Sequence, residues 1–299
     1  MLEPHLIIHL LLAMIQFLTG VLVNGIIMVV NGMDLIKQKK MIPLNLLISC
    51  LAISRICLQL AVFSIDLAFL SLIEFPPLTE KFAVLTFVND LGLWLATWLS
   101  VFYCARIAPV AHPLFFLLKM KISKLVPWLI LGSLLYASSS AFFHSKNRWA
   151  FSKEDFLGLL SPNATTQFKD IPALQFAFLF VEHSLPLLIF LISSLLLLFY
   201  LGRHTWQMRN TATGPRTPHM RVYINTLLSI LSFLVLYLCH YMTSALLFYR
   251  IFNLRSFIFL FLIFMVGSYQ SGHSITLILG NPKMKQNAKK LLLPRKCCQ

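Results

Sequence analysis

The amino-acid sequence predicts an all-α membrane protein, a bundle of seven transmembrane helices with the N-terminus outside the cell and the C-terminus in the cytoplasm. Of the 299 residues, 58% are hydrophobic and 12% are charged, whereas about 25% of the residues of a soluble domain are charged. A single soluble core does not bury so much apolar surface, so a lipid bilayer is the expected solvent. Two further observations support this prediction, the seven long apolar runs and the placement of the basic residues.

Each predicted span is an apolar run long enough to cross the hydrocarbon core of a bilayer, which takes about 20 helical residues. The first run starts almost at Met1 and is too long for the apolar region of a signal peptide, so we expect it to remain as a span. Polar, charged or proline-bearing segments separate the runs and end each helix. With no strand pattern and no soluble domain, residues 1–299 are predicted to form one domain with a tail at 281–299. The predicted spans are His5–Val30, Pro43–Ala68, Phe82–Ile107, Leu125–Ser145, Pro172–Leu201, Val222–Tyr249 and Ser256–Gly280.

Lysines and arginines are distributed unequally between the two predicted membrane faces. Of the 25, seventeen lie in the connections after the first, third and fifth spans and in the tail, and seven lie in the other connections. Because basic residues concentrate on the cytoplasmic side, the tail is predicted inside and the N-terminus outside. The sequon Asn163-Ala164-Thr165 lies in an outer connection, which predicts an N-glycan on Asn163. We expect a multi-pass protein of the plasma membrane.

None of the six cysteines lies in an outer connection, so no disulfide is predicted to link the outer loops. Four of them stand in apolar runs, where small buried side chains are expected. Cys297 and Cys298 stand in the basic tail and are candidates for palmitoylation.

Polar residues inside the spans fall into two layers, and such residues usually face the interior of a bundle. The inner layer holds Asn24, Arg55, His273 and Ser274. Arg55 lies too deep to reach water easily, so it needs acceptors, and Asn24, Ser274 and backbone carbonyls are of that kind. Two interpretations remain open, a static polar brace and a brace that rearranges when the protein is activated.

The outer layer consists of polar residues from three spans at similar depth, which describes a cavity open to the outside. They are Asn89, Asp90, Glu182, His183 and His240. Asp66 and Glu74 add negative charge near the outer rim. A small-molecule site combines such groups with apolar walls. The alternative is hydrogen bonding between helices with no cavity.

Other chemistries have little support in this sequence. His5 and His9 are four residues apart, but a metal site needs more ligands at the same depth, so neither a metal nor a cofactor is expected. No nucleophile elbow, phosphate-binding loop or zinc-protease motif is present, so an enzyme is not expected. Nucleic acid is not expected either, because the basic residues belong to the inner loops of a membrane protein. Asp90 and Glu182 could form a proton path in a transporter or channel subunit, although no internal repeat of the kind that transporters show is seen.

The seven spans suggest a G-protein-coupled receptor, but the marks of the rhodopsin-like class are missing. The third span ends in Phe102-Tyr103-Cys104-Ala105-Arg106 instead of D-R-Y, and the sixth span has no proline. The sequence instead resembles the bitter taste receptors, type 2, over nearly its whole length. The matching stretches are Asn24, Leu51-Ala52-Ile53-Ser54-Arg55, Trp94-Leu95-Ala96-Thr97, Leu185-Pro186, Leu201-Gly202-Arg203-His204 and His273 to Lys283. A vomeronasal type 1 pheromone receptor is a nearer rival than a transporter and fits these stretches poorly.

This resemblance implies that the chain binds small bitter ligands and couples to a heterotrimeric G protein with a gustducin-type α subunit and β and γ subunits. It implies ligand contacts from Asn89, Glu182, His183, His240 and Ile263. We expect the same pocket to include Leu85, Asp90, Leu93 and Tyr241, below the rim acids Asp66 and Glu74. We expect Asp90 and Glu182 to favour cationic or amine ligands. The residues implied in activation are Asn24, Arg55, Tyr103, His273 and Ser274, and those facing the G protein are Arg106, Lys119, Arg203, His204 and Arg209. Gln270 departs from the family, which commonly has proline there, and a homo- or hetero-dimer is compatible with the sequence.

Overall fold

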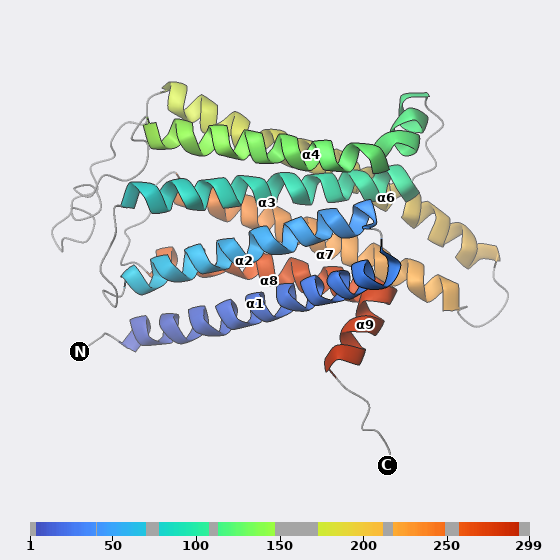
Figure 1. The fold of residues 1–299 in the computed structure, drawn as a ribbon, viewed down its shortest axis with the longest axis horizontal. Coiled ribbons are helices and arrows are strands. Elements are labelled where there is room, and N and C mark those ends of the chain that lie inside the picture. The colour runs from blue at the N-terminus through green and yellow to red at the C-terminus, as the bar shows by residue number, and fades with distance from the viewer. Residues whose placement is uncertain are drawn as a thin grey trace, which may run out of the picture.

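The computed structural model describes residues 4–39, 41–69, 78–107, 113–146, 173–211, 218–248 and 257–292, and nearly all of these residues lie in helices. The predicted all-α class is therefore confirmed for this part of the chain. Figure 1 shows the long helices running side by side, with the N-terminus at one end of the bundle and the short last helix at the other. The helices are α1 (Pro4–Gln38), α2 (Pro43–Phe69), α3 (Leu78–Ile107), α4 (Pro113–Lys146), α6 (Ala173–Thr211), α7 (Pro218–Phe248), α8 (Phe257–Gly280) and α9 (Pro282–Leu292).

Each predicted span overlaps one of the helices α1, α2, α3, α4, α6, α7 and α8. Within the described residues, five helical stretches are long and apolar enough to cross a membrane, judged by length and composition. α7 contributes a shorter apolar stretch, Leu227–Thr243. The five longer stretches are Ile7–Gln38, Pro43–Ser64, Ala83–Ile107, Lys119–Ser145 and Phe180–Gln207.

Several helices begin at a proline, which is favoured at the first helical position because its fixed φ suits the helix and its missing N–H has no partner there anyway. Within the described residues these starts are Pro4, Pro43, Pro113, Pro218 and Pro282. α1 ends at a turn in which Lys39 takes the left-handed conformation, with φ of 52°. The amide of Lys39 donates to the carbonyl of Leu35, so the turn satisfies a carbonyl of the last helical turn.

Some helices continue beyond the predicted spans. α1 runs to Gln38 instead of Val30, α6 runs to Thr211 instead of Leu201, and α4 starts at Pro113 instead of Leu125. The prediction followed the apolar runs and stopped where lysine or arginine appeared. Both are good helix formers, so a helix need not end where its apolar run ends.

The end of α8 follows the sequence Gly280-Asn281-Pro282. α8 ends at Gly280, as predicted for the last span. The Oδ1 atom of Asn281 accepts a hydrogen bond from the amide of Met284 at 3.2 Å, which caps a new helix whose first residue is Pro282. The predicted tail therefore contains α9, which buries Met284 and Ala288 and exposes its lysines.

The interior of the bundle holds polar residues among its apolar core, and its outer surface is rich in apolar side chains, unlike the surface of a soluble domain. Asn24, Arg55, Asp90, Glu182 and His273 are all buried. Large apolar side chains are exposed along the flanks of the helices, for example Leu18, Leu22, Trp128, Phe142 and Phe199. Exposed apolar surface of this extent requires an apolar solvent or partner, which a bilayer provides.

Candidate functional site

The first polar site joins α1, α2 and α8 and consists of Asn24, Arg55 and Ser274, which we call the Ser274 network. The Nη1 atom of Arg55 donates to the Oγ atom of Ser274 at 2.9 Å. The hydroxyl of Ser274 contacts Oδ1 of Asn24 at 2.7 Å, and Nδ2 of Asn24 donates to the carbonyl of Gly20 at 2.8 Å. All three side chains are buried. The structure thus brings together the residues that the sequence placed in one inner layer.

Two glutamines extend this polar contact along the same three helices. The Nε2 atom of Gln59 on α2 donates to the carbonyl of Gly267 at 2.9 Å and to Oγ of Ser271 at 3.2 Å, both on α8. Gln16 on α1 donates to the carbonyl of Phe264 at 2.9 Å. The sequence prediction missed these residues, although a glutamine inside an apolar run is itself a detectable feature.

A column of rings connects the outer layer to the Ser274 network. His240 on α7 stacks on Tyr269 of α8, with ring centroids 4.5 Å apart. Tyr269 lies parallel to His273 at 6.0 Å, and His273 precedes Ser274 in the chain. The ring centroid of His273 also lies 3.5 Å from the ring centroid of Phe233 on α7. We call His240, Tyr269 and His273 the ring column, because the three rings are stacked in succession where α7 packs against α8.

The second polar site joins α3, α4 and α6 and consists of Asp90, Ser140, His144 and Glu182, which we call the α4 acid cluster. The Oγ atom of Ser140 lies 2.8 Å from Oδ2 of Asp90 and also contacts Oε1 of Glu182. The Nε2 atom of His144 lies 2.9 Å from Oε2 of Glu182. All four side chains are buried. The two acids therefore meet through α4, a helix that contributed no residue to the predicted site.

Another predicted acid is paired with a histidine near the start of α1. The Nε2 atom of His9 lies 3.1 Å from Oδ1 of Asp66, and both side chains are buried. Asp66 was expected at the rim of a cavity, and the structure places it against α1 instead. In the described part of the chain, no group of three or more histidines, cysteines, aspartates or glutamates is arranged to hold a metal ion.

The remaining predicted ligand contacts are more dispersed. Asn89, His183 and Tyr241 are half-buried. Leu85 packs with Leu58, Val62 and Val88 between α2 and α3, whereas Leu93 belongs to the main core. The side chain of Ile263 and the residues Glu74, Asn163, Cys297 and Cys298 lie outside the described set.

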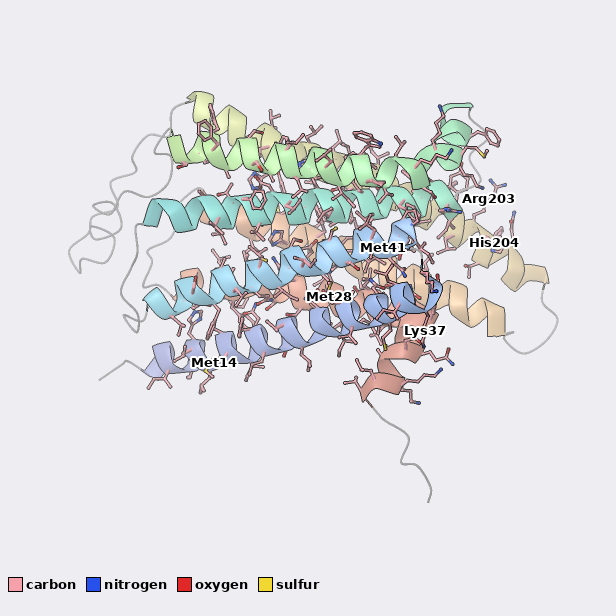
Figure 2. All side chains as sticks on the ribbon, in the orientation of Figure 1. Met14, Met28, Lys37, Met41, Arg203 and His204 are labelled. Carbon is pink, nitrogen blue, oxygen red and sulfur yellow. The ribbon has the colours of Figure 1, made fainter. Side chains whose placement is uncertain are left out.

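The residues predicted to face a G protein are exposed where the structure describes them. Figure 2 shows Arg203 and His204 of α6 toward the same end of the bundle as Lys37 of α1. Arg106 donates to Oγ of Ser123 at 2.8 Å, and its guanidinium lies 5.6 Å from the ring centre of Phe102. Lys119 is exposed, and the side chain of Arg209 is outside the described set. Tyr103 packs against Cys104 and Leu197 where α3 meets α6.

Comparison with known proteins gives matches along the whole chain. The model of the family described as Taste receptor protein (TAS2R) matches residues 1–296. Taste receptor type 2 member 1 of Pan paniscus is 58% identical over 299 residues, which cover 100% of both chains. Taste receptor type 2 member 119 of Rattus norvegicus is 47% identical over 298 residues, which cover 100% of this chain and 88% of that protein. Taste receptor type 2 member 2 of Homo sapiens is 31% identical over 304 residues, covering 97% of each chain.

Proposed function

The chain belongs to the TAS2R family of type 2 taste receptors, and from this premise we propose that it is a seven-span receptor of the plasma membrane. In this proposal it detects small bitter molecules from the outside and activates a gustducin-type heterotrimeric G protein. The observation that carries the proposal is the full-length similarity to taste receptors, together with a contact path between the two polar layers. A receptor needs such a path, because a ligand shifts a conformational equilibrium only by its differential affinity for the two states.

The ring column supplies this path. A ligand beside His240 changes the environment of its ring, which is stacked on Tyr269. Tyr269 in turn lies against His273, and the next residue, Ser274, binds both Arg55 and Asn24. A small displacement of α8 relative to α7 would therefore alter the contacts among α1, α2 and α8. In this mechanism the Ser274 network is the element that ligand binding rearranges.

The opposite end of the bundle suits an acidic partner. Arg106, Lys119, Arg203 and His204 are exposed there. The guanidinium of Arg106 is oriented by its hydrogen bond to Ser123. Opening of the inner ends of α6 and α7 would admit a G-protein helix beside these groups, where charge complementarity with acidic residues favours association.

A calcium-release assay tests the proposed function directly. Cells expressing the receptor together with a gustducin-type chimeric α subunit are expected to respond to members of a panel of bitter compounds. Cells that lack either the receptor or the chimera are expected not to respond. A transporter or channel subunit predicts compound flux that is independent of the chimera, and that result would exclude the proposed coupling.

The proposed orientation predicts a glycan on Asn163. Replacement of Asn163 by glutamine is expected to increase the electrophoretic mobility of the receptor and to abolish the shift produced by peptide N-glycosidase F. Asn147, in the same predicted connection but outside any sequon, is the matched control, and Asn147→Gln is expected to leave the glycosylated band in place. A wild-type band that the glycosidase does not shift would remove this support for an outer fourth-to-fifth connection.

A further inference from the structure

The buried acids of the α4 acid cluster share a single hydroxyl group. Ser140 lies within hydrogen-bonding distance of a carboxyl oxygen of Asp90 and of one of Glu182. A serine hydroxyl carries one hydrogen and so donates to only one acceptor at a time. Its second contact becomes a hydrogen bond only when the other carboxyl group carries a proton and donates it to the serine oxygen. Both contacts of Ser140 are therefore hydrogen bonds when one of the two carboxyl groups is protonated.

The contacts around the two acids indicate which one carries this proton. Glu182 has the His144 ring nitrogen 2.9 Å from its second oxygen, and a histidine N–H stabilises an ionised carboxylate. No basic side chain bonds to Asp90 within the part of the chain that the structure describes. A consistent chain of donors then runs from the Asp90 carboxyl to the Ser140 oxygen, and from the Ser140 hydroxyl to Glu182.

We propose that Asp90 is held as a neutral carboxylic acid, so that the α4 acid cluster is internally satisfied and presents no free negative charge to a ligand. This inference rests on the proposed function and specifies its ligand class, uncharged small molecules that carry hydrogen-bonding groups. It replaces the expectation that Asp90 and Glu182 select amines.

The other groups of the outer layer agree with an uncharged ligand. Asp66 is bonded to His9, so it does not supply a free carboxylate either. The amide of Asn89 is half-buried. Within the described residues, Nδ1 of His240 and Oη of Tyr269 are buried polar atoms without a hydrogen-bond partner. Buried polar atoms are normally hydrogen-bonded, and none of these three groups is an acid.

Infrared spectroscopy of the purified receptor tests the proton without any ligand or G protein. The wild type minus Asp90→Asn difference spectrum is expected to show the C=O band of a protonated carboxyl group, and the band should shift in D2O. Ser140→Ala should move the band, because it removes the proton acceptor. Ser138→Ala is the matched control and should leave the band in place, because Ser138 is exposed and its hydroxyl donates to the carbonyl of Leu134 in its own helix. A difference spectrum without this band would overturn the proposal.

Folding of the conservative variants provides a second test. An asparagine amide donates to Ser140 as a protonated acid does, so Asp90→Asn is expected to reach the cell surface at the wild-type level. Glu182→Gln replaces the proposed charged partner of His144 and is expected to reduce surface expression. The reverse order, with Asp90→Asn retained in the cell and Glu182→Gln at the surface, would assign the proton to Glu182.

Ligand selectivity is tested with an amine agonist from the panel and its uncharged N-acetyl derivative. We expect the concentration for half-maximal response to differ by less than about threefold between the two compounds in the wild type, and this ratio to stay within about threefold in Asp90→Asn. A loss of more than about tenfold, equal to 1.4 kcal/mol, that is confined to the amine in Asp90→Asn would show a direct ion pair and refute the proposal. A receptor that gives no G-protein response at all contradicts the proposed function, while the infrared result stands independently.

Discussion

Replacement of Ser274 by alanine is expected to lower the free energy of unfolding by about 3 kcal/mol and to abolish signalling. The Ser274 hydroxyl is the only hydrogen-bond partner of the Arg55 guanidinium within the described residues, and it also contacts Oδ1 of Asn24. Alanine leaves a buried cationic donor and a buried acceptor unsatisfied. Each loss costs about 1–3 kcal/mol, and more for a charged group. Thermal unfolding of the purified receptor in detergent, with surface expression in cells, measures the effect.

The matched control is Thr276→Ala, two residues further along α8. The hydroxyl of Thr276 donates to the carbonyl of His273 in its own helix, so its loss is expected to cost less than about 1 kcal/mol. A double variant isolates the cause. If the cost arises from an unsatisfied buried charge, Arg55→Met combined with Ser274→Ala should be more stable than Ser274→Ala alone. A double variant that is less stable than either single variant would show that Arg55 contributes through other contacts.

Residue type and depth along the spans were sufficient to predict the Ser274 network. Asn24, Arg55 and Ser274 are polar residues at similar depth in three apolar runs, and a buried arginine needs acceptors. The structure places them in contact. This inference required only depth, which is read from position in a span, and not the rotation of each helix about its axis.

The sequence did not show how each helix is rotated about its own axis. In a membrane helix the lipid-facing side and much of the packed side are both apolar, so periodicity barely distinguishes them. Asp90 and Glu182 were therefore assigned to a cavity between the third, fifth, sixth and seventh spans, whereas they meet at Ser140 and His144 of α4. Both α4 residues stand near the predicted end of their span, in Ser138-Ser139-Ser140 and His144-Ser145, where polar residues suggest the approach of a loop.

The contacts among α1, α2 and α8 show how apolar helices of this chain associate with one another. In lipid, helices associate through close packing and hydrogen bonds between helices, not through hydrophobic burial. Both kinds of contact join α1, α2 and α8. Gln16 and Gln59 donate hydrogen bonds to carbonyls of α8, and glycines at these points allow the helices to approach closely. The glycines and the glutamines therefore act together, and each is expected to depend on the other.

Replacement of Gly20 by alanine tests this dependence and is expected to destabilise the receptor by about 2 kcal/mol, within the range for overpacked cores. A Cβ atom at Gly20 would lie 2.7 Å from Nε2 of Gln59 and 2.9 Å from Oγ of Ser271. Gln59 has little freedom to move away, because Nε2 is bonded to the carbonyl of Gly267 and to Ser271. The added methyl group must therefore separate α1 from α2 and α8, or break these bonds. Thermal unfolding and agonist response measure the result.

Gly25 in the same helix is the matched control, because a Cβ atom there would meet nothing within 4 Å. Gly25→Ala should be neutral or stabilising, since alanine is the better helix former by up to about 1 kcal/mol. Gln59→Ala should recover part of the stability lost in Gly20→Ala, because it removes the side chain that the new methyl group meets. Equal damage from Gly20→Ala and Gly25→Ala would show that helix flexibility, and not close approach, accounts for the glycine at position 20. Without any recovery in the double variant, the contact of α1 with Ser271 would be the limiting one, because the Ser271 hydroxyl is the other group that a Cβ atom at Gly20 approaches.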